Sequence, residues 1–258
     1  MARKRKNTNG ESGGRGGGSG SQSSSTDTKS KNSNNRPLTG KKLSHALSWA
    51  LRHQALAIGL TILPDGYVPV DEILSSTHPK LKGATLEEIQ KMVETNDKQR
   101  FRLDQKLRSD FYGISDVNAD ETIICIRANQ GHSIKTINPE LLFRRLSPEE
   151  LRTLPCIVHG TYVEPWKSIQ KTGLKKMNRT HMHFASGLPD ADGVISGMRK
   201  TSTIFIFVDP VKCAEGSIEF FISANGVILS SGIEGTLPPT YFSHVTGTSG
   251  DILMDNRS

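Results

Sequence analysis

The segment KKLSHALSWALRH, residues 41–53, is the first part of the chain with a clear folding pattern. Its apolar residues recur at the three- and four-residue spacing of a single helix face, and these are Leu43, Ala46, Leu47, Ala50 and Leu51. On a helical wheel Arg52 projects from the opposite side, and His53 lies at the edge of the apolar stripe. The pattern predicts a helix that packs through one face and ends in two basic side chains.

The residues that follow predict two more helices and two strands. A short helix is predicted for residues 70–74, and Thr85 and Glu88 have the spacing of a capping box that opens a third helix. Residues 100–103 and 123–126 have the composition of strands. Because three helices followed by a two-stranded wing are typical of a winged helix, we expect residues 39–137 to form such a lobe.

The second half of the folded chain has a different pattern. A polar segment, residues 138–155, is predicted to be a linker, and a helix around Trp166 and Ile169 is predicted to end at Gly173. Strands are predicted at residues 157–162, 182–185, 203–209, 219–223 and 227–230. The chain is therefore expected to be an α+β protein, with a strand-rich second lobe over residues 156–250.

The first 38 residues carry most of the net charge. They contain eight Lys or Arg and two Asp or Glu, a net of +6, whereas the other 220 residues have a net charge of +1. Seven Gly and eight Ser leave this tail too few apolar residues to form a core, so we expect it to be disordered. The cluster Arg3-Lys4-Arg5-Lys6 suits a nuclear signal or a nucleic-acid tether, but a solvated run of charge is the favoured interpretation.

Several classes of protein do not fit this composition. There is no apolar run of about 18 residues, and the amino terminus lacks the apolar core of a signal peptide, so we expect neither a membrane span nor a secreted protein. Three widely spaced cysteines favour a reducing compartment, the cytoplasm or the nucleus. A monomer is the default expectation. P-loop, dinucleotide-type glycine, nucleophile-elbow and zinc-protease motifs are all missing from the sequence.

Arginines and histidines next to glycines are the remaining candidates for chemistry. They are Arg52, His53, Arg100, Arg127, His132, His159, Arg179, His181 and His183. Converging guanidinium groups suit a doubly charged phosphate, and histidine can hydrogen-bond the phosphate or move a proton. His181 and His183 would share one face of a strand and could chelate a metal, but no third ligand has a convincing spacing.

Each candidate also has a purely structural interpretation. Arg52 and His53 could complement the dipole at the end of their helix. His159 could be a hydrogen-bonded core histidine, and Arg100 a surface residue of its strand. The residues alone therefore predict a phosphate-handling pocket, and the nature of its ligand stays open at this level.

Seven blocks of sequence together resemble the tRNA 2′-phosphotransferase family. In chain order they are Leu51-Arg52-His53, residues 95–101 (TNDKQRF), 127–133 (RANQGHS), 159–161 (HGT), 179–183 (RTHMH), 196–199 (SGMR) and 223–227 (SANGV). The resemblance covers about residues 43–245. It implies a winged-helix lobe that binds the RNA 2′-phosphate, joined to a lobe of the ADP-ribosyltransferase type that binds NAD.

The resemblance also implies a reaction. A 2′-phosphate left at a splice junction of tRNA attacks the anomeric carbon of the nicotinamide ribose, and nicotinamide leaves. The ribose 2″-hydroxyl then attacks the transferred phosphate, which gives 2′-OH RNA and ADP-ribose 1″,2″-cyclic phosphate. The implied partners are tRNA with an internal 2′-phosphate and NAD as a consumed co-substrate, without a metal.

By the same resemblance, the family's essential residues fall on Arg52, His53, Arg100 and Arg179. The first three are expected to hold the RNA 2′-phosphate, and Arg179 to span the NAD side and the moving phosphate. The NAD site is expected to include His159, Gly160, Thr161, Ser196, Gly197 and Arg199.

One departure from the wider ADP-ribosyltransferase pattern concerns the late strand. Protein-modifying members often carry a glutamate there, whereas residues 225–227 (NGV) have none, as suits a reaction in which the 2″-hydroxyl is itself a nucleophile. Two alternative functions stay open on the sequence. One is an ADP-ribosyltransferase that caps terminal phosphates of nucleic acids, and the other is a non-catalytic RNA-binding protein that keeps the fold.

Overall fold

The computed structural model describes residues 37–114, 118–189, 191 and 197–257. The predictions for Ser196 and for almost all of the tail therefore lie outside the described residues. Residues Arg36–Ser258 form one compact unit, which contains both halves discussed above.

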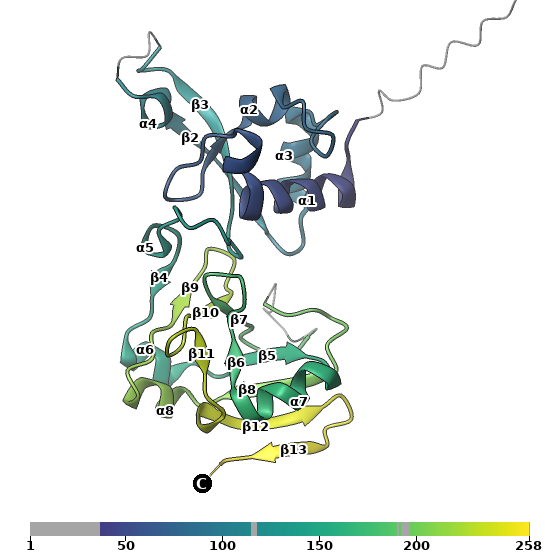
Figure 1. Ribbon diagram of the computed structural model, residues 1–258, viewed down its shortest axis with the longest axis vertical. Helices are drawn as coiled ribbons and strands as arrows, with labels where there is room; N and C mark the ends of the chain where they lie inside the picture. Colours follow the sequence, from purple (N-terminus) through teal and green to yellow (C-terminus); the bar gives the residue numbers. More distant parts are fainter. Residues whose placement is uncertain (1–36, 115–117, 190, 192–196, 258) are drawn as a thin grey trace, which may run out of the picture. The chain divides into compact units, whose positions relative to one another are not determined.

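The first half contains a three-stranded sheet and the predicted helices (Figure 1). The sheet has the order β1 (Val68–Pro69), β3 (Thr122–Ala128), β2 (Phe101–Leu107). The helical elements are α1 (Gly40–Trp49), a π-helical turn η1 (Ala50–Gln54), a 3-10 turn η2 (Leu56–Ile58), α2 (Val70–Ser75), α3 (Leu86–Thr95) and α4 (Arg108–Tyr112). The predicted apolar face is confirmed, because Leu43, Ala46, Leu47, Ala50 and Leu51 are all buried.

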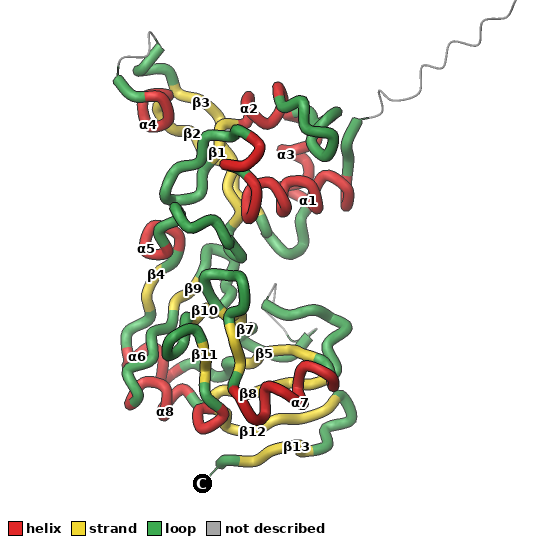
Figure 2. The backbone as a smooth tube through the Cα atoms, viewed as in Figure 1, coloured by secondary structure: helices red, strands yellow, loops and turns green. Residues whose placement is uncertain are grey.

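The second half contains three further sheets (Figure 2). Their strands run in the orders β4-β9-β10-β7, β11-β6 and β13-β12-β8-β5. The strands are β4 (Arg144–Arg145), β5 (Val158–Thr161), β6 (Leu174–Lys175), β7 (Met182–Phe184), β8 (Ile204–Val208), β9 (Phe221–Ile222), β10 (Ile228–Ser230), β11 (Thr236–Leu237), β12 (Phe242–Gly247) and β13 (Ile252–Asp255). The helical elements are α5 (Pro139–Leu142), α6 (Pro148–Thr153), α7 (Val163–Thr172), α8 (Pro210–Glu215) and a 3-10 turn η3 (Pro239–Tyr241).

Antiparallel pairing of the described strands confirms the α+β class. The segment for which the sequence indicates a linker, residues 138–155, carries α5, β4 and α6, and Ser147 and Glu150 form a capping box at α6. The sequence did not predict α8, β12 or β13. No described helix has the length and apolarity needed to span a bilayer.

The two halves share an apolar core. The cluster built by α1, α3 and β3 also includes Phe221, Val227 and Leu229 from the region of β9 and β10. Hydrogen bonds cross between the halves at the same level: the Thr180 N–H donates to the carbonyl of His132 at 3.1 Å, and the Asn225 side-chain amide donates to the carbonyl of Lys98 at 3.0 Å. These contacts fix the loops that carry the candidate site.

Candidate functional site

Arg52 lies on the π-helical turn at the end of α1, and its guanidinium is largely enclosed. Gly131 packs beside it, since a Cβ added to Gly131 would lie 3.5 Å from three atoms of the Arg52 side chain, an ordinary van der Waals contact. The buried Nε and Nη2 of Arg52 have no hydrogen-bond partner among the described residues. Because a buried cation without partners is costly, this side chain is suited to receive an anionic ligand.

Two further arginines stand close enough to influence Arg52. Burial, Arg179 and Arg100 lower the pKa of Arg52 to about 10, which still leaves it charged at neutral pH. Arg100 directly precedes β2 and donates to the side chain of Asn96, while Arg179 directly precedes the segment that leads into β7. Within the described part of the chain none of the three is in an ion pair. Three like charges close together, none of them in an ion pair with a described carboxylate, favour binding of a polyanion.

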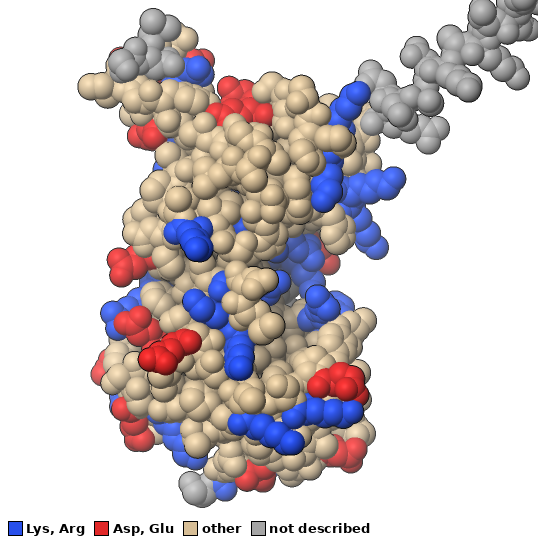
Figure 3. Space-filling view, in the orientation of Figure 1, with Lys and Arg blue, Asp and Glu red and all other residues tan. Residues whose placement is uncertain are grey.

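A cavity of about 790 Å³ brings together residues from both halves of the chain. His53 and Ser133 line it from the first half, and Lys175, Lys176 and Arg179 are its cations from the second half. No Asp or Glu occurs among the described residues that line it. Figure 3 shows Lys and Arg side chains gathered around a hollow below α1. The volume and the charge suit a small anionic molecule.

Two histidines in this cavity are oriented by neighbouring groups. The Nδ1 of His53 lies 2.9 Å from the hydroxyl of Ser133, whose N–H donates to the carbonyl of Arg52. The Nδ1 of His159 donates to the carbonyl of His183 at 2.8 Å. Because burial lowers the pKa of His159, its ring is neutral and Nε2 is free to accept a hydrogen bond.

Other buried histidines surround the site in the neutral form. Burial, aided by Arg52, lowers the pKa of His132 to about 3, and burial lowers that of His181 to about 4. His181 packs edge-on against the rings of Phe143 and Phe221. Within the described residues, no group of three potential ligands is placed to hold a metal ion, and His181 and His183 instead line the cavity.

The structure places the predicted site residues in three groups. His53, His159 and Arg179 line the 790 Å³ cavity, and Arg52 lies within electrostatic reach of His53 and Arg179. Arg100 lines a separate cavity of about 560 Å³. Gly160, Thr161, Gly197 and Arg199 are not among the described residues that line the larger cavity.

Gly160, Thr161, Gly197 and Arg199 instead pack against, or electrostatically influence, residues of neighbouring segments. A Cβ on Gly160, in β5, would lie 2.6 Å from the hydroxyl of Ser202, and one on Gly197, whose φ is +120°, would lie 2.7 Å from Ala185. Thr161 is buried, and burial together with Arg199 lowers the pKa of Arg179. Gly160 therefore leaves room for the side chain of Ser202, and Gly197 permits close approach of the backbone at Ala185.

Three residues that line the cavity were not predicted as site residues from the sequence. Ser133 closes the RANQGHS block and contacts His53, and Lys175 and Lys176 follow the helix-ending Gly173. Lys175 ends the short strand β6 and Lys176 follows it, and a basic pair at such a place is no sequence signal of a binding site. Sequence alone does not say that this segment lines a cavity together with His53.

Comparison with known proteins identifies similar chains. The model of the family described as RNA 2′-phosphotransferase, Tpt1 / KptA family, matches residues 39–232. The "tRNA 2′-phosphotransferase 1" of Homo sapiens is 44% identical over 203 residues, which are 78% of this chain and 73% of that protein. The "tRNA 2′-phosphotransferase" of Saccharomyces cerevisiae is 40% identical over 200 residues, 74% of this chain and 79% of that protein. A relative from Schizosaccharomyces pombe is 40% identical over 215 residues, and the chain spans about half of its length (53%).

Proposed function

The chain belongs to the RNA 2′-phosphotransferase, Tpt1 / KptA family, and we propose from this premise that it removes the splice-junction 2′-phosphate of tRNA by transferring it to NAD. It is accordingly an enzyme, a transferase that acts on an RNA 2′-phosphate. The products of the proposed reaction are 2′-OH RNA, nicotinamide and ADP-ribose 1″,2″-cyclic phosphate.

One observation carries the proposal most directly. Arg100 and Arg179 lie within electrostatic reach of the Arg52 guanidinium, and Arg52 keeps two buried donors without a partner in the described chain. A phosphomonoester carries close to two negative charges at neutral pH and three strong acceptor oxygens. It therefore satisfies both the charge and the unpaired donors of this cluster.

In the proposed RNA-binding role, Arg52 and Arg100 grip the 2′-phosphate and hold it for attack. His53, which the Ser133 hydroxyl orients, donates a hydrogen bond to a phosphate oxygen. Positioning and charge stabilisation of this kind are the main contributions of a protein to phosphoryl transfer. This role agrees with a winged-helix identity of the first half, which we propose on the three-helix and three-strand arrangement.

The 790 Å³ cavity fits NAD by size and by its donors. Lys175, Lys176 and Arg179 suit a pyrophosphate, and no carboxylate among the described lining residues would repel it. When bound, NAD supplies the ribose that accepts the phosphate and the nicotinamide that leaves. We assign His159 to the nicotinamide ribose side, with Gly160, Thr161, Gly197 and Arg199 shaping the surrounding segments, in keeping with an ADP-ribosyltransferase type of second half.

Binding measurements on separate ligands test these assignments. Without NAD, an RNA with one internal 2′-phosphate should bind the protein more tightly than the same RNA with a 2′-hydroxyl. Arg52→Ala should reduce this preference by about 10- to 100-fold, the loss expected for charge-assisted hydrogen bonds. Arg152→Ala is the matched control, since Arg152 is exposed on α6.

The NAD side is tested by the double substitution Lys175→Ala and Lys176→Ala. It should weaken NAD binding, measured calorimetrically, and leave the preference for 2′-phosphorylated RNA in place. Equal binding of both RNAs by the unaltered protein would contradict the proposed phosphate site. Unchanged NAD affinity in the double variant would contradict the placement of the pyrophosphate.

A further inference from the structure

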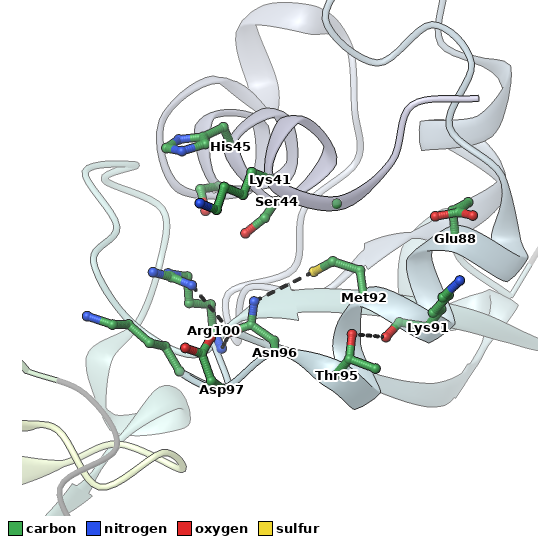
Figure 4. A pocket seen from close by; sticks show the side chains of 13 residues that line it. Lys41, Ser44, His45, Glu88, Lys91, Met92, Thr95, Asn96, Asp97 and Arg100 are labelled. Carbon is green, nitrogen blue, oxygen red and sulfur yellow. Dashed lines mark hydrogen bonds between the residues drawn. The ribbon is translucent and has the colours of Figure 1, made fainter. Parts of the chain in front are cut away.

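A second cavity, of about 560 Å³, lies between α1 and α3 and includes Arg100. We call it the α1–α3 groove and define it by the six residues Lys41, Ser44, His45, Lys91, Asn96 and Arg100. Figure 4 shows Lys41, Ser44 and His45 projecting from α1, with Asn96 and Arg100 on the side that faces them. The groove is thus a polar channel that has one of the site arginines in its wall.

The charge of the groove is positive although the folded chain is nearly neutral. Lys41, Lys91, Lys98 and Arg100 line it, against Glu88 and Asp97 as the acidic residues of its wall. Lys41 and Lys91 are exposed, and neither has an ion-pair partner among the described residues. Unpaired ammonium groups on opposite walls, with hydroxyl and amide groups between them, suit an extended anion.

The groove shares Arg100 with the cluster formed by Arg52, Arg100 and Arg179. Arg52 lies within electrostatic reach both of Arg100, which lines the groove, and of Arg179, which lines the 790 Å³ cavity. None of the described lining residues is shared by the two cavities. An RNA whose 2′-phosphate contacts Arg100 would therefore have its neighbouring backbone beside the groove.

We propose that the α1–α3 groove binds the RNA backbone next to the 2′-phosphate, so that the flanking phosphodiesters contact Lys41 and Lys91. The inference rests on the proposed function, in which the 790 Å³ cavity is taken up by NAD. Four Lys and Arg side chains line the groove, and ammonium and guanidinium groups can contact RNA phosphates whatever the neighbouring bases are. We therefore expect recognition that is directed to phosphates and independent of base sequence.

The test compares two RNAs that carry the same 2′-phosphate, a dinucleotide and a ten-nucleotide strand. The variant is Lys41→Glu with Lys91→Glu, and its control is Lys42→Glu with Lys82→Glu, which makes the same change of charge at exposed lysines outside the groove. Affinity is measured by fluorescence anisotropy without NAD, over a series of salt concentrations. NAD-dependent turnover is measured in parallel, and thermal unfolding confirms that each variant is folded.

The groove variant should bind the ten-nucleotide strand at least about tenfold more weakly than the unaltered protein does. The slope of the logarithm of affinity against the logarithm of salt concentration should become shallower by about 0.7 for each phosphodiester that the protein no longer binds. The KM of the groove variant should rise while kcat stays close to that of the unaltered protein. The dinucleotide and the control variant should show little change. The neutral pair Lys41→Gln with Lys91→Gln should give a smaller loss in the same direction.

Other results overturn the inference. Equal losses for the groove variant and its control, or for the dinucleotide and the longer strand, would mean that the effect is one of general charge. A ten-nucleotide strand whose binding does not change would exclude the groove as its site. If the unaltered protein turns over neither RNA, the proposed function fails, and the inference fails with it. If the unaltered protein turns over the dinucleotide, the proposed function holds, and the results with the ten-nucleotide strand then test the groove assignment alone.

Discussion

At the scale of single residues, the site is a set of cations held close together before any anion is present. Burial, Arg52 and Arg179 all lower the pKa of His53, and the Ser133 hydroxyl lies 2.9 Å from its Nδ1. The mutual repulsion of these groups is relieved when a phosphate enters. The protonation of His53 therefore reports directly on the proposed ligand.

We expect the pKa of His53 to rise when a 2′-phosphorylated RNA binds. In the free protein the nearby guanidinium groups disfavour the imidazolium form, and a bound dianion offsets their charge. Binding then takes up protons, so affinity should increase as the pH falls toward about 6, where the phosphate itself begins to gain a proton. NMR titration of the His53 imidazole with and without the RNA measures this, and His78, which lines neither the groove nor the larger cavity, is the internal control. A pKa that is unchanged or lowered in the complex would contradict the assignment.

The sequence singled out these residues as candidates but did not predict the environment in which the structure places them. Arg52 was expected on the side of the helix opposite the apolar stripe, because the wheel assumes a regular α-helix. The helix instead widens into a π-helical turn at residues 50–54, and Arg52 becomes partly enclosed beside Gly131. The burial of Arg52 depends on contacts between segments that are distant in the sequence, and so does the position of Arg100 outside the larger cavity. No local sequence pattern encodes such contacts.

At the scale of elements, the connection from α7 to β6 places Lys175 and Lys176 at the cavity. α7 ends at Gly173, whose φ of +85° and ψ of +169° are accessible essentially to glycine alone. A Cβ at this position would lie 2.6 Å from the carbonyl oxygen of Leu237 in β11. The glycine thus fixes both the end of the helix and the pairing of β6 with β11.

Gly173→Ala should destabilise the protein more than Gly113→Ala. Gly113 ends α4 with nearly the same backbone angles, φ +85° and ψ +166°, but a Cβ there would meet nothing within 4 Å. The two substitutions share the conformational cost, so their difference isolates the clash with Leu237, which we expect to be about 1–3 kcal/mol. Urea unfolding of both variants gives this difference. Equal losses of stability would contradict the close contact between the two segments.

Elements with strong local signals were predictable, and short or edge strands were not. The side chain of Thr85 accepts from the Glu88 N–H at 3.3 Å and begins α3 as expected, and Gly173 ends α7. β13 is missing from the prediction because it is an edge strand with mostly exposed residues, so it has no alternating apolar pattern. β4 has only two residues, and its pairing with β9 exists only through tertiary contact.

At the scale of the whole molecule, one apolar core and several neutral histidines join the two halves. Phe221, Val227 and Leu229 pack into the core of the first half, and His132 accepts a hydrogen bond from Thr180 through its carbonyl. The pKa of His183, like those of His132 and His181, lies well below its ordinary value because the ring is buried. The folded state therefore excludes protons that the unfolded chain would take up.

Stability should consequently fall as the pH drops below about 6.5, the ordinary pKa of histidine in an unfolded chain. The folded-state pKa values are lowered, to about 4 for His181 and about 3 for His132. The contribution of these neutral histidines to the free energy of unfolding is therefore complete above pH 6.5, and it is lost progressively as the pH falls toward the folded-state pKa values. Each histidine that stays neutral in the folded state adds up to about 1.4 kcal/mol per pH unit to the slope.

Urea unfolding between pH 7.5 and 5 measures this dependence. His132→Gln should flatten it, whereas replacement of the exposed His45 by Gln should leave it unchanged. A free energy of unfolding that is constant over this range would contradict the neutral, buried state of these rings.

The central claim is that this arrangement of arginines and histidines removes a 2′-phosphate from RNA at the expense of NAD. Its most direct test incubates a short RNA bearing one internal 2′-phosphate with the protein, with and without NAD, and follows the RNA by gel and the small products by mass spectrometry. The account predicts 2′-OH RNA, nicotinamide and ADP-ribose 1″,2″-cyclic phosphate only when NAD is present. An RNA unchanged by folded protein and NAD, or an ADP-ribosylated RNA that persists, would contradict it.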